Sequence, residues 1–518
     1  MLQRIAGVLI PLFSLRTTDD LGRGEIRGLI PMADFALAMG HRMIQLLPID
    51  ETAPGETSPY SAMSVLAIDP LYISARGLDG HFLEGIDAAE IEAARVSAGP
   101  GDPPDAVKLK AARMKLLAKS SRHFAASKSP GDRRAFEEFE HRNQDWLDDY
   151  VLFRALKEKF CWSEWASWPG GLDRRAPSAL KAASRELAQE ISTYSYIQFV
   201  AHRQWSEVRA ELAPRGVMLG GDIAFSPARE SAEVWANQEM FDLTRTVGAP
   251  PDAFSKNGQR WGLPMPNWAR MRAAGFSLIR TRIRHARELF DLMRIDHVVG
   301  LFRTYAFGID SAAPGAFDPP DEAAQRAQGE EIICVAKKEA GPLEIFAEDL
   351  GLIPPFVRES LVALGTPGYK VMRWEREWNA AGQPFIDPAT YSELSIATTG
   401  THDTETMAEW WQDANRNERC QFIASLKLAG AIEPQRDTLG DRAVDAILSA
   451  LYAAPSRLTI APLQDLFGWK ERVNTPGTVD AINWKWRLPF ALDRLPDNSE
   501  LSARIAALHA IASRTRRI

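Results

Sequence analysis

Eight short apolar runs recur along the 518-residue chain, and they limit its possible folds more than any other feature. Most are continuous rather than alternating, as expected of strands that are buried on both faces. The runs are GVLIPLF (7–13), MIQLLPI (43–49), VMLGGDIAF (217–225), LMRIDHV (292–298), EIFAEDLG (344–351), YKVMRW (369–374), SIATTGTHD (395–403) and LTIAPLQDLFG (458–468). Helical patterns or long insertions separate them. This alternation predicts an α/β fold, a (β/α)8 TIM barrel with its active site at the C-terminal ends of the strands.

We expect one catalytic barrel over residues 1–518, with inserted, mostly helical subdomains and no separate C-terminal β domain. The interval of about 74–200 is too long for a barrel loop. Between residues 134 and 160 its apolar residues recur at three- and four-residue steps, which indicates a helix with one buried face. We predict a helical subdomain there. A second insertion, about 226–268, is rich in glycine and proline and is predicted to be a loop-rich segment covering the cleft, with a lid near 247–258.

Composition argues against several classes of partner. The net charge of −7 disfavours electrostatic attraction to nucleic acid or to anionic membranes. No apolar stretch reaches the roughly eighteen residues that span a bilayer. Cys161, Cys334 and Cys420 are far apart and odd in number, so they suggest neither a disulfide framework nor a zinc site. A cytoplasmic location is therefore predicted.

Three of the runs end in a carboxylate with polar neighbours: Asp296 in RIDH, Glu348 in AEDLG and Asp403 in THD. A parallel barrel delivers such side chains to one mouth. Glycoside cleavage needs two carboxylates, one ionised as nucleophile and one protonated as acid. Arg294 shares the side-chain direction of Asp296 on a strand and is expected to keep it ionised. Glu348 lacks such an adjacent cation, and Asp349 is expected to disfavour its ionisation if it lies close by.

His297 and His402 each adjoin one of these carboxylates, and both can donate hydrogen bonds to sugar hydroxyls. Neighbouring Asp and His also suggest metal ligands, but neither HxH nor HExxH spacing is present. We therefore predict no metal and no cofactor. A single strand-end carboxylate is more often a cap or an ion-pair partner, so the prediction of a site depends on all three occurring together.

The order of several motifs resembles the amylomaltase family, the 4-α-glucanotransferases or disproportionating enzymes of glycoside hydrolase family 77. The matching stretches are AGVLIPLFSLR (6–16), SPYSAMSVLAIDPLYIS (58–74), GGDIAFSPARESAEVWANQEMF (220–241) and GQRWGLPMPNW (258–268), followed by RIDHVVGL, AEDLG, GTHD, QDLFG, RVNTPGT and NWKWRL. They cover most of the chain, and the helical insertion is the weakest part of the resemblance. GQxWGxPxxxW, AEDLG and NTPGT together are specific.

The resemblance implies a role for each matching residue. Asp296 is the expected nucleophile, Glu348 the expected acid and base, and Asp403 the expected stabiliser of the oxocarbenium-like transition state. Substrate-binding contacts are expected from Ser58, Tyr60, Gln259, Trp261, Arg294, His297, Trp374, His402 and Asn474. Tyr60 is expected to stack under the sugar ring.

The implied activity is transfer of α-1,4-glucan segments to the 4-hydroxyl of an acceptor glucan or glucose by a retaining double displacement. Maltooligosaccharides are the expected substrates, within maltodextrin, starch or glycogen metabolism, and the chain is expected to be a monomer or homodimer. An α-glucan hydrolase with the same carboxylates and a non-catalytic glucan-binding protein are the alternatives. Two departures from the family pattern, Val298–Val299 in DHVVG and Thr404–Glu405 in THDTET, could change acceptor contacts or chain-length preference.

Overall fold

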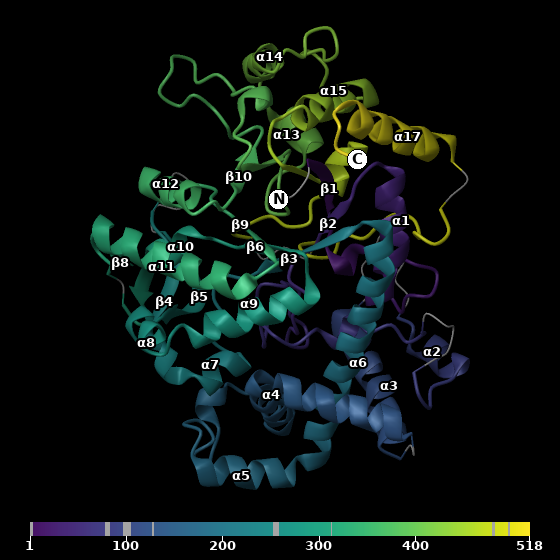
Figure 1. The fold of residues 1–518 in the computed structure, drawn as a ribbon, viewed down its shortest axis with the longest axis vertical. Coiled ribbons are helices and arrows are strands. Elements are labelled where there is room, and N and C mark those ends of the chain that lie inside the picture. The colour runs from purple at the N-terminus through teal and green to yellow at the C-terminus, as the bar shows by residue number, and fades with distance from the viewer. Residues whose placement is uncertain are drawn as a thin grey trace.

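A computed structural model describes the chain except for residues 1–3, 78–82, 97–104, 127–128, 252–257, 312, 479–481 and 496–497. Its centre is a closed barrel of eight parallel strands surrounded by helices (Figure 1). The strands are β1 (Ile5–Leu9), β2 (Met43–Gln45), β3 (Met218–Ile223), β6 (Leu292–Ile295), β9 (Glu344–Ala347), β10 (Gly368–Val371), β11 (Ser395–Thr398) and β12 (Leu458–Pro462). Each predicted run overlaps one strand, and β12 pairs with β1 to close the barrel. The predicted (β/α)8 barrel is confirmed.

The longer helices around the barrel bury one apolar face each. In α15 (Asp441–Tyr452), for example, Val444, Ile447, Leu448 and Leu451 are buried at helical spacing. The others are α1 (Leu29–Ala38), α9 (Ser277–Leu289), α10 (Val299–Phe302), α11 (Glu322–Ala340), α12 (Pro355–Ala363), α13 (Met407–Asp413), α14 (Arg416–Ser425), α16 (Leu463–Phe467) and α17 (Ser499–Arg514). No helix within the described residues is both long enough and apolar enough to cross a membrane.

Side chains fill the inside of the barrel. Nine buried residues from seven of the eight strands form one apolar cluster: Ile5, Leu9, Met43, Leu292, Phe346, Tyr369, Ile396, Leu458 and Ile460. A filled barrel offers no channel through its centre, so a substrate must meet the polar residues at the strand ends.

The interval between β2 and β3 contains α2 (Ala88–Ala94), α3 (Ala106–Ala126), α4 (Pro130–Lys159), α5 (Pro177–Glu186) and α6 (Ala188–Leu212). In Figure 1, α4 and α5 lie below the barrel and α6 leads back to it. The indole of Trp205 on α6 donates a hydrogen bond to the carbonyl of Leu289 at 2.7 Å. The end of the insertion expected near residue 200 therefore falls inside α6, a continuous helix that belongs to the insertion at its start and contacts a barrel helix at its end.

The segment 226–268 is more regular than the predicted loop. It contains α7 (Ala232–Ala236), α8 begins at its end (Trp268–Ala273), and β4 (Phe241–Ala249) pairs with β5 (Gln259–Pro266). With β7 (Thr304–Gly308) and β8 (Ala316–Asp318), these strands form a second sheet in the order β5-β4-β7-β8.

Glycine and proline concealed this hairpin in the sequence. A Cβ atom at Gly248 would lie 1.8 Å from the carbonyl oxygen of Gln259, so the close approach of the two strands requires glycine there. The register of β4 against β5 also shifts twice. Half of the predicted lid, residues 252–257, lies outside the described residues, and the structure describes only its two ends.

Candidate active site at the mouth of the barrel

Arg294 holds two carboxylates together at the C-terminal end of the barrel. It lies on β6, and its Nη2 atom is 2.8 Å from Oδ1 of Asp296, as the shared strand direction predicts. Its Nη1 atom donates to both oxygens of Asp222, at 2.8 and 2.7 Å. Asp222 and Arg294 are register partners on the adjacent strands β3 and β6. A buried guanidinium bound on both sides keeps Asp296 paired and fixed in position.

Tyr60 extends this chain of contacts. Its hydroxyl donates to Oδ2 of Asp222 at 2.7 Å, and burial together with the charge of Asp222 raises the pKa of Tyr60 well above its usual value. The hydroxyl therefore remains protonated as a donor. The Tyr60 ring lies stacked on His402, with ring centroids 5.3 Å apart, and Trp484 packs against both rings.

Glu348 follows β9 and is bound by backbone amides. Its Oε2 accepts from the N–H of His297 at 2.9 Å, and its Oε1 accepts from the N–H of Leu350 at 2.8 Å. Burial raises the pKa of Glu348 to about 7; Arg294 opposes this shift and Asp296 adds to it. A carboxyl group of this kind is protonated for much of the time near neutral pH, as an acid catalyst requires.

Asp349 does not cause that shift, contrary to the reason expected from the sequence. Its carboxylate accepts from the N–H of Tyr369 at 2.7 Å and from Nε of Arg358 at 3.2 Å. Consecutive residues at a strand end point to opposite faces, so Asp349 is turned toward β10 and α12. Burial is the largest cause of the raised pKa of Glu348.

Asp403 has the opposite electrostatic setting. Burial would raise its pKa, but His402, with Nε2 3.2 Å from Oδ2, and Asn474, whose amide donates to Oδ1 at 2.6 Å, hold the pKa of Asp403 well below its usual range. The carboxylate is therefore ionised at all working pH values. A fixed negative charge stabilises the positive charge that develops on a sugar ring during cleavage.

Of the four residues that depart from the family pattern, Val298, Val299 and Thr404 are buried, and Glu405 is half-buried. Thr404 Oγ1 accepts from the N–H of Thr401 at 2.9 Å and closes the turn that carries Asp403. The Glu405 carboxylate pairs with the buried Arg373 at 3.4 Å. Val298 and Val299 are both buried at the start of α10. An effect of these four residues on acceptor contacts stays a prediction, and an effect of the three buried ones must act through the loops they stabilise.

The β4–β5 hairpin reaches the site through Trp261. The Trp261 ring meets His297 edge-on, with centroids 4.8 Å apart, and Phe225 contacts the same imidazole at 5.6 Å. Burial lowers the pKa of His297 to about 4, so the imidazole is neutral near pH 7. Gln259 is exposed, and its side-chain oxygen accepts from the Trp261 indole at 3.4 Å.

Two predicted binding residues lie further out. Ser58 supports the Tyr60 turn, because its hydroxyl accepts from the N–H of Tyr60 at 3.4 Å. Trp374 follows β10, and 41% of it is exposed to solvent. The structure therefore groups six of the nine predicted binding residues around the carboxylates by direct or one-step contacts, and Ser58, Gln259 and Trp374 are not among them. Sugar binding by all nine stays a prediction.

Three residues of the site were not identified from the sequence. Asp222 lies in the C-terminal half of the third apolar run, as Asp296 does in the fourth, and this repeated pattern could have revealed it. Trp484 stands in the NWKWRL motif. Asp465, in QDLFG, accepts from the hydroxyl of Thr399 at 2.5 Å and from the N–H of Met407 at 2.7 Å, and so fixes the loop that carries Asp403.

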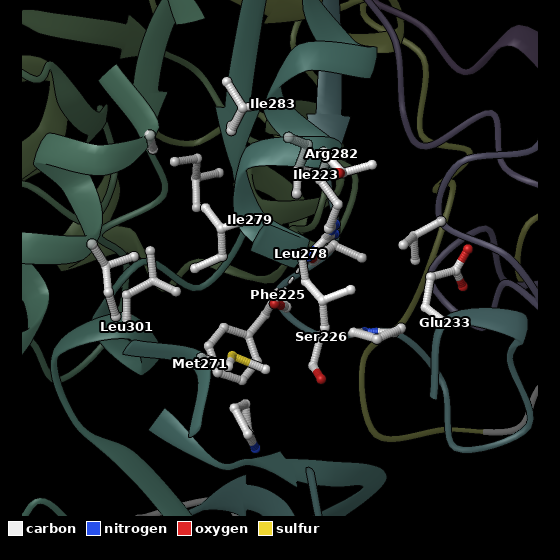
Figure 2. Close-up of a pocket in the computed structure, with 18 of the residues that line it drawn as sticks. Ile223, Phe225, Ser226, Glu233, Met271, Leu278, Ile279, Arg282, Ile283 and Leu301 are labelled. Atoms are coloured by element: carbon white, nitrogen blue, oxygen red, sulfur yellow. Dashed lines mark hydrogen bonds between the residues drawn. The ribbon is translucent and has the colours of Figure 1, made fainter. Parts of the chain in front are cut away.

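An apolar cavity of about 80 Å³ lies behind this site, between β3, β6 and α9. Figure 2 shows Phe225, Met271, Leu278 and Ile279 among its lining residues. None of the three predicted catalytic carboxylates lines it, so the cavity is not the place where they act. Among the described residues, no group of three His, Cys, Asp or Glu side chains is placed to hold a metal ion.

A closed parallel barrel that presents an ion-paired aspartate and a protonatable glutamate from neighbouring strands defines a glycoside-processing (β/α)8 enzyme. The sequence profile of the 4-alpha-glucanotransferases, glycoside hydrolase family 77, matches residues 10–493. The chain therefore belongs to this family of 4-α-glucanotransferases.

Individual relatives agree with the family assignment. A 4-alpha-glucanotransferase of Thermus thermophilus is 34% identical over 495 residues, which cover 93% of each chain. One of Chlamydia muridarum is 30% identical over 519 residues, covering 97% of this chain and 94% of the relative. An amylomaltase of Streptococcus agalactiae in complex with acarbose superposes with a TM-score of 0.85 at 27% identity, over 99% of this chain and 100% of that chain.

Proposed function

We propose that this 4-α-glucanotransferase moves α-1,4-glucan segments by a retaining double displacement in which Asp296, Glu348 and Asp403 act directly. The observation that supports the proposal is the contrast between the two carboxyl groups beside Arg294. Asp296 is held in an ion pair, whereas the pKa of Glu348 is raised to about 7. One nucleophile and one acid are what a retaining mechanism needs.

In the first step, an oxygen of Asp296 attacks the anomeric carbon of the donor, and the bond from that carbon to the leaving 4-oxygen breaks. Glu348 gives its proton to that oxygen. In the second step, Glu348 takes the proton of the acceptor 4-hydroxyl, whose oxygen forms a bond to the anomeric carbon and releases Asp296. Two inversions retain the configuration. Asp403 stabilises the oxocarbenium-like charge in both steps.

Sugar positioning is assigned to the surrounding side chains. Neutral His297 and the neighbouring His402 offer hydrogen bonds to hydroxyl groups, while Tyr60 and Trp261 offer aromatic surfaces. Asn474 holds Asp403 in its orientation. Gln259, Ser58 and Trp374 would contact more distant sugars, and Arg294 serves the nucleophile rather than the sugar.

Product analysis on maltotriose tests the activity. Glucose together with maltooligosaccharides longer than maltotriose is the expected result. Products that are only shorter indicate a hydrolase, and unchanged maltotriose contradicts the proposal. A second measurement tests the nucleophile: Glu348→Gln incubated with a maltosyl fluoride, which needs no acid to leave, should accumulate a covalent sugar on the peptide that contains Asp296. A labelled peptide from another part of the chain would refute that assignment.

The physiological setting is also part of the proposal. We assign the enzyme to maltodextrin, starch or glycogen metabolism in the cytoplasm. The three cysteines are free and exposed, which suits a reducing compartment. A monomer or homodimer is expected, and light scattering on the purified chain would measure the oligomeric state.

A further inference from the structure

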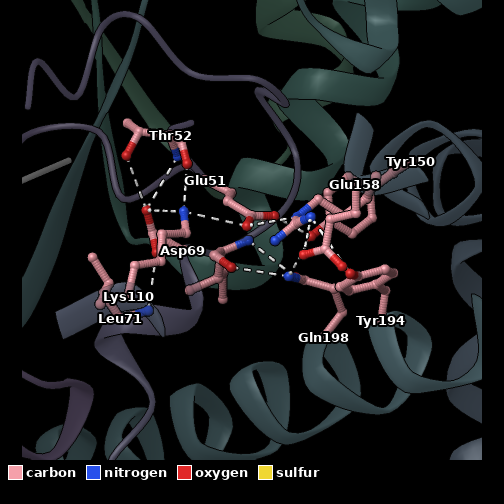
Figure 3. Close-up of polar contacts among 11 residues, drawn as sticks. Glu51, Thr52, Asp69, Leu71, Lys110, Tyr150, Glu158, Tyr194 and Gln198 are labelled. Atoms are coloured by element: carbon pink, nitrogen blue, oxygen red, sulfur yellow. Dashed lines mark hydrogen bonds and ion pairs between the residues drawn. The ribbon is translucent and has the colours of Figure 1, made fainter. Parts of the chain in front are cut away.

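A buried group of charged side chains joins the helical insertion to the loop that carries Tyr60 (Figure 3). Glu51 begins that loop, and its side chain is fully buried. Lys110 of α3 lies 3.3 Å from its Oε1 atom. From α4, Arg154 Nε donates to Oε1 at 3.2 Å and the Tyr150 hydroxyl donates to Oε2. These four residues, here called the Glu51 cluster, attach a carboxylate of the barrel loop to two helices of the insertion.

The Glu51 cluster also closes the base of the loop. Residues 51–69, here called the Tyr60 loop, leave the barrel after β2 and return beside their starting point. Asp69 at the far end accepts from the N–H of Thr52 at 3.1 Å, and Lys110 lies 3.3 Å from the same carboxylate. One lysine of the insertion thus binds both ends of the loop.

The tip of the Tyr60 loop is bound by the catalytic barrel. The Tyr60 hydroxyl donates to Asp222, Asp222 binds Arg294, and Arg294 binds Asp296. A continuous series of polar contacts therefore runs from the tip of the loop to the predicted nucleophile, while the base of the same loop is held by the insertion.

We propose that the Glu51 cluster is a positioning device for the transfer reaction, through which the helical insertion sets the place of the Tyr60 hydroxyl and, by way of it, of Asp222 and Arg294. The inference rests on the proposed function. Buried ion pairs add little net stability compared with apolar packing of equal volume. Their value here is directional, because three donors from two helices hold one carboxylate in a single orientation.

The test compares Glu51→Gln in two backgrounds, native and Tyr60→Phe, with kcat and KM measured on maltotriose in the full chain. In the native background we expect kcat/KM to fall roughly tenfold or more, as small displacements remote from the chemistry can cause. In the Tyr60→Phe background, where the hydroxyl is already absent, Glu51→Gln should lower kcat/KM less than about threefold, because the effects of coupled residues are not additive.

Glu25→Gln is the matched control. Glu25 is a buried partner of the same helix α3, paired with Arg113 at 2.6 Å, and it lies outside the Tyr60 loop. Its loss should lower the melting temperature by an amount similar to that caused by Glu51→Gln, while kcat/KM below the melting temperature stays at the native value.

Equal losses of kcat/KM in the two backgrounds, or a folded Glu51→Gln variant with native kcat/KM, would overturn the positioning role. If Glu51→Gln does not fold, Tyr150→Phe replaces it in the test, because this change removes one hydrogen bond and keeps all the charges. Equal losses of kcat/KM on Tyr150→Phe in the native and Tyr60→Phe backgrounds would then overturn the positioning role. A native chain that leaves maltotriose unchanged refutes the proposed function, whereas an active native chain without the coupling refutes this inference alone.

Discussion

Asp222 contacts no sugar in the proposed mechanism, yet replacing it with asparagine should slow the reaction strongly. The substitution keeps the size of the side chain and removes one of the two negative charges that flank Arg294. Two short hydrogen bonds, 2.7 and 2.8 Å long, hold the guanidinium on the Asp222 side, against one ion-pair contact of 2.8 Å on the Asp296 side. Without the Asp222 charge, Arg294 is free to shift toward Asp296 and pairs more strongly with it.

A nucleophile that is bound more tightly by its counter-ion attacks more slowly. Hydrogen bonds to charged groups contribute about 1.5–3 kcal/mol each. An amide oxygen still accepts one bond from Arg294, so the net loss corresponds to about one such bond. If about 2 kcal/mol of that loss raises the activation free energy, kcat should fall roughly 30-fold. The effect on KM should be small, because no sugar contact is removed.

The assay is glucose release from maltotriose by Asp222→Asn at temperatures below its melting transition, with circular dichroism to verify the fold. Asp222→Ala is the companion variant, and its kcat should fall at least as far. A kcat within a factor of about two of the native value would refute the reasoning, because it would show that the ion pair is not coupled to the barrier.

Four further outcomes are expected. Because the raised pKa of Glu348 keeps it protonated only below about pH 7, kcat/KM should decline as pH rises through 7. Glu348→Gln should abolish this decline and lower kcat about 100-fold or more. A decline that persists in the variant belongs to another group. Asp403→Asn should reduce kcat without a new pH limb between pH 5 and 8, since the native carboxylate stays ionised there; titration of kcat over that range checks this. Trp261→Ala should raise KM and leave the melting temperature within a few degrees, because the half-exposed ring packs edge-on against His297; an unchanged KM would contradict the assigned contact. Leu448→Ala, in the buried face of α15, should cost about 2–5 kcal/mol of unfolding free energy in a denaturant titration; a smaller loss would mean that the core collapses around the gap.

The barrel was predictable because its strands are buried on both faces. Continuous apolar runs of this kind stand out against the surrounding chain, and the polar residues that end them mark the mouth. The 226–268 segment lacks such continuous apolar runs. Its strands carry Gly248, Gly262 and two prolines, which permit close approach and register shifts and which erase the apolar pattern at the same time.

The sequence also indicated the pairing of Arg294 with Asp296, since two residues two apart on a strand point the same way. It did not indicate the second partner of Arg294. Asp222 lies 72 residues away and becomes a neighbour only because β3 and β6 are adjacent in the barrel. For the same reason the expected influence of Asp349 was wrong: adjacent in the chain to Glu348, it faces the other side of the strand end and binds Arg358 and Tyr369 instead.

The sequence by itself determined the barrel and the places of the three carboxylates after its strands, because these depend on local patterns: apolar runs, strand alternation and short motifs. The tertiary structure decided the pKa values of two of them, Glu348 and Asp403. The high pKa of Glu348 comes first from burial, and the low pKa of Asp403 comes from His402 and Asn474, which meet only when β11 and the segment after β12 fold together. Burial and long-range contacts are properties of the packed molecule, so no pattern along the chain contains them.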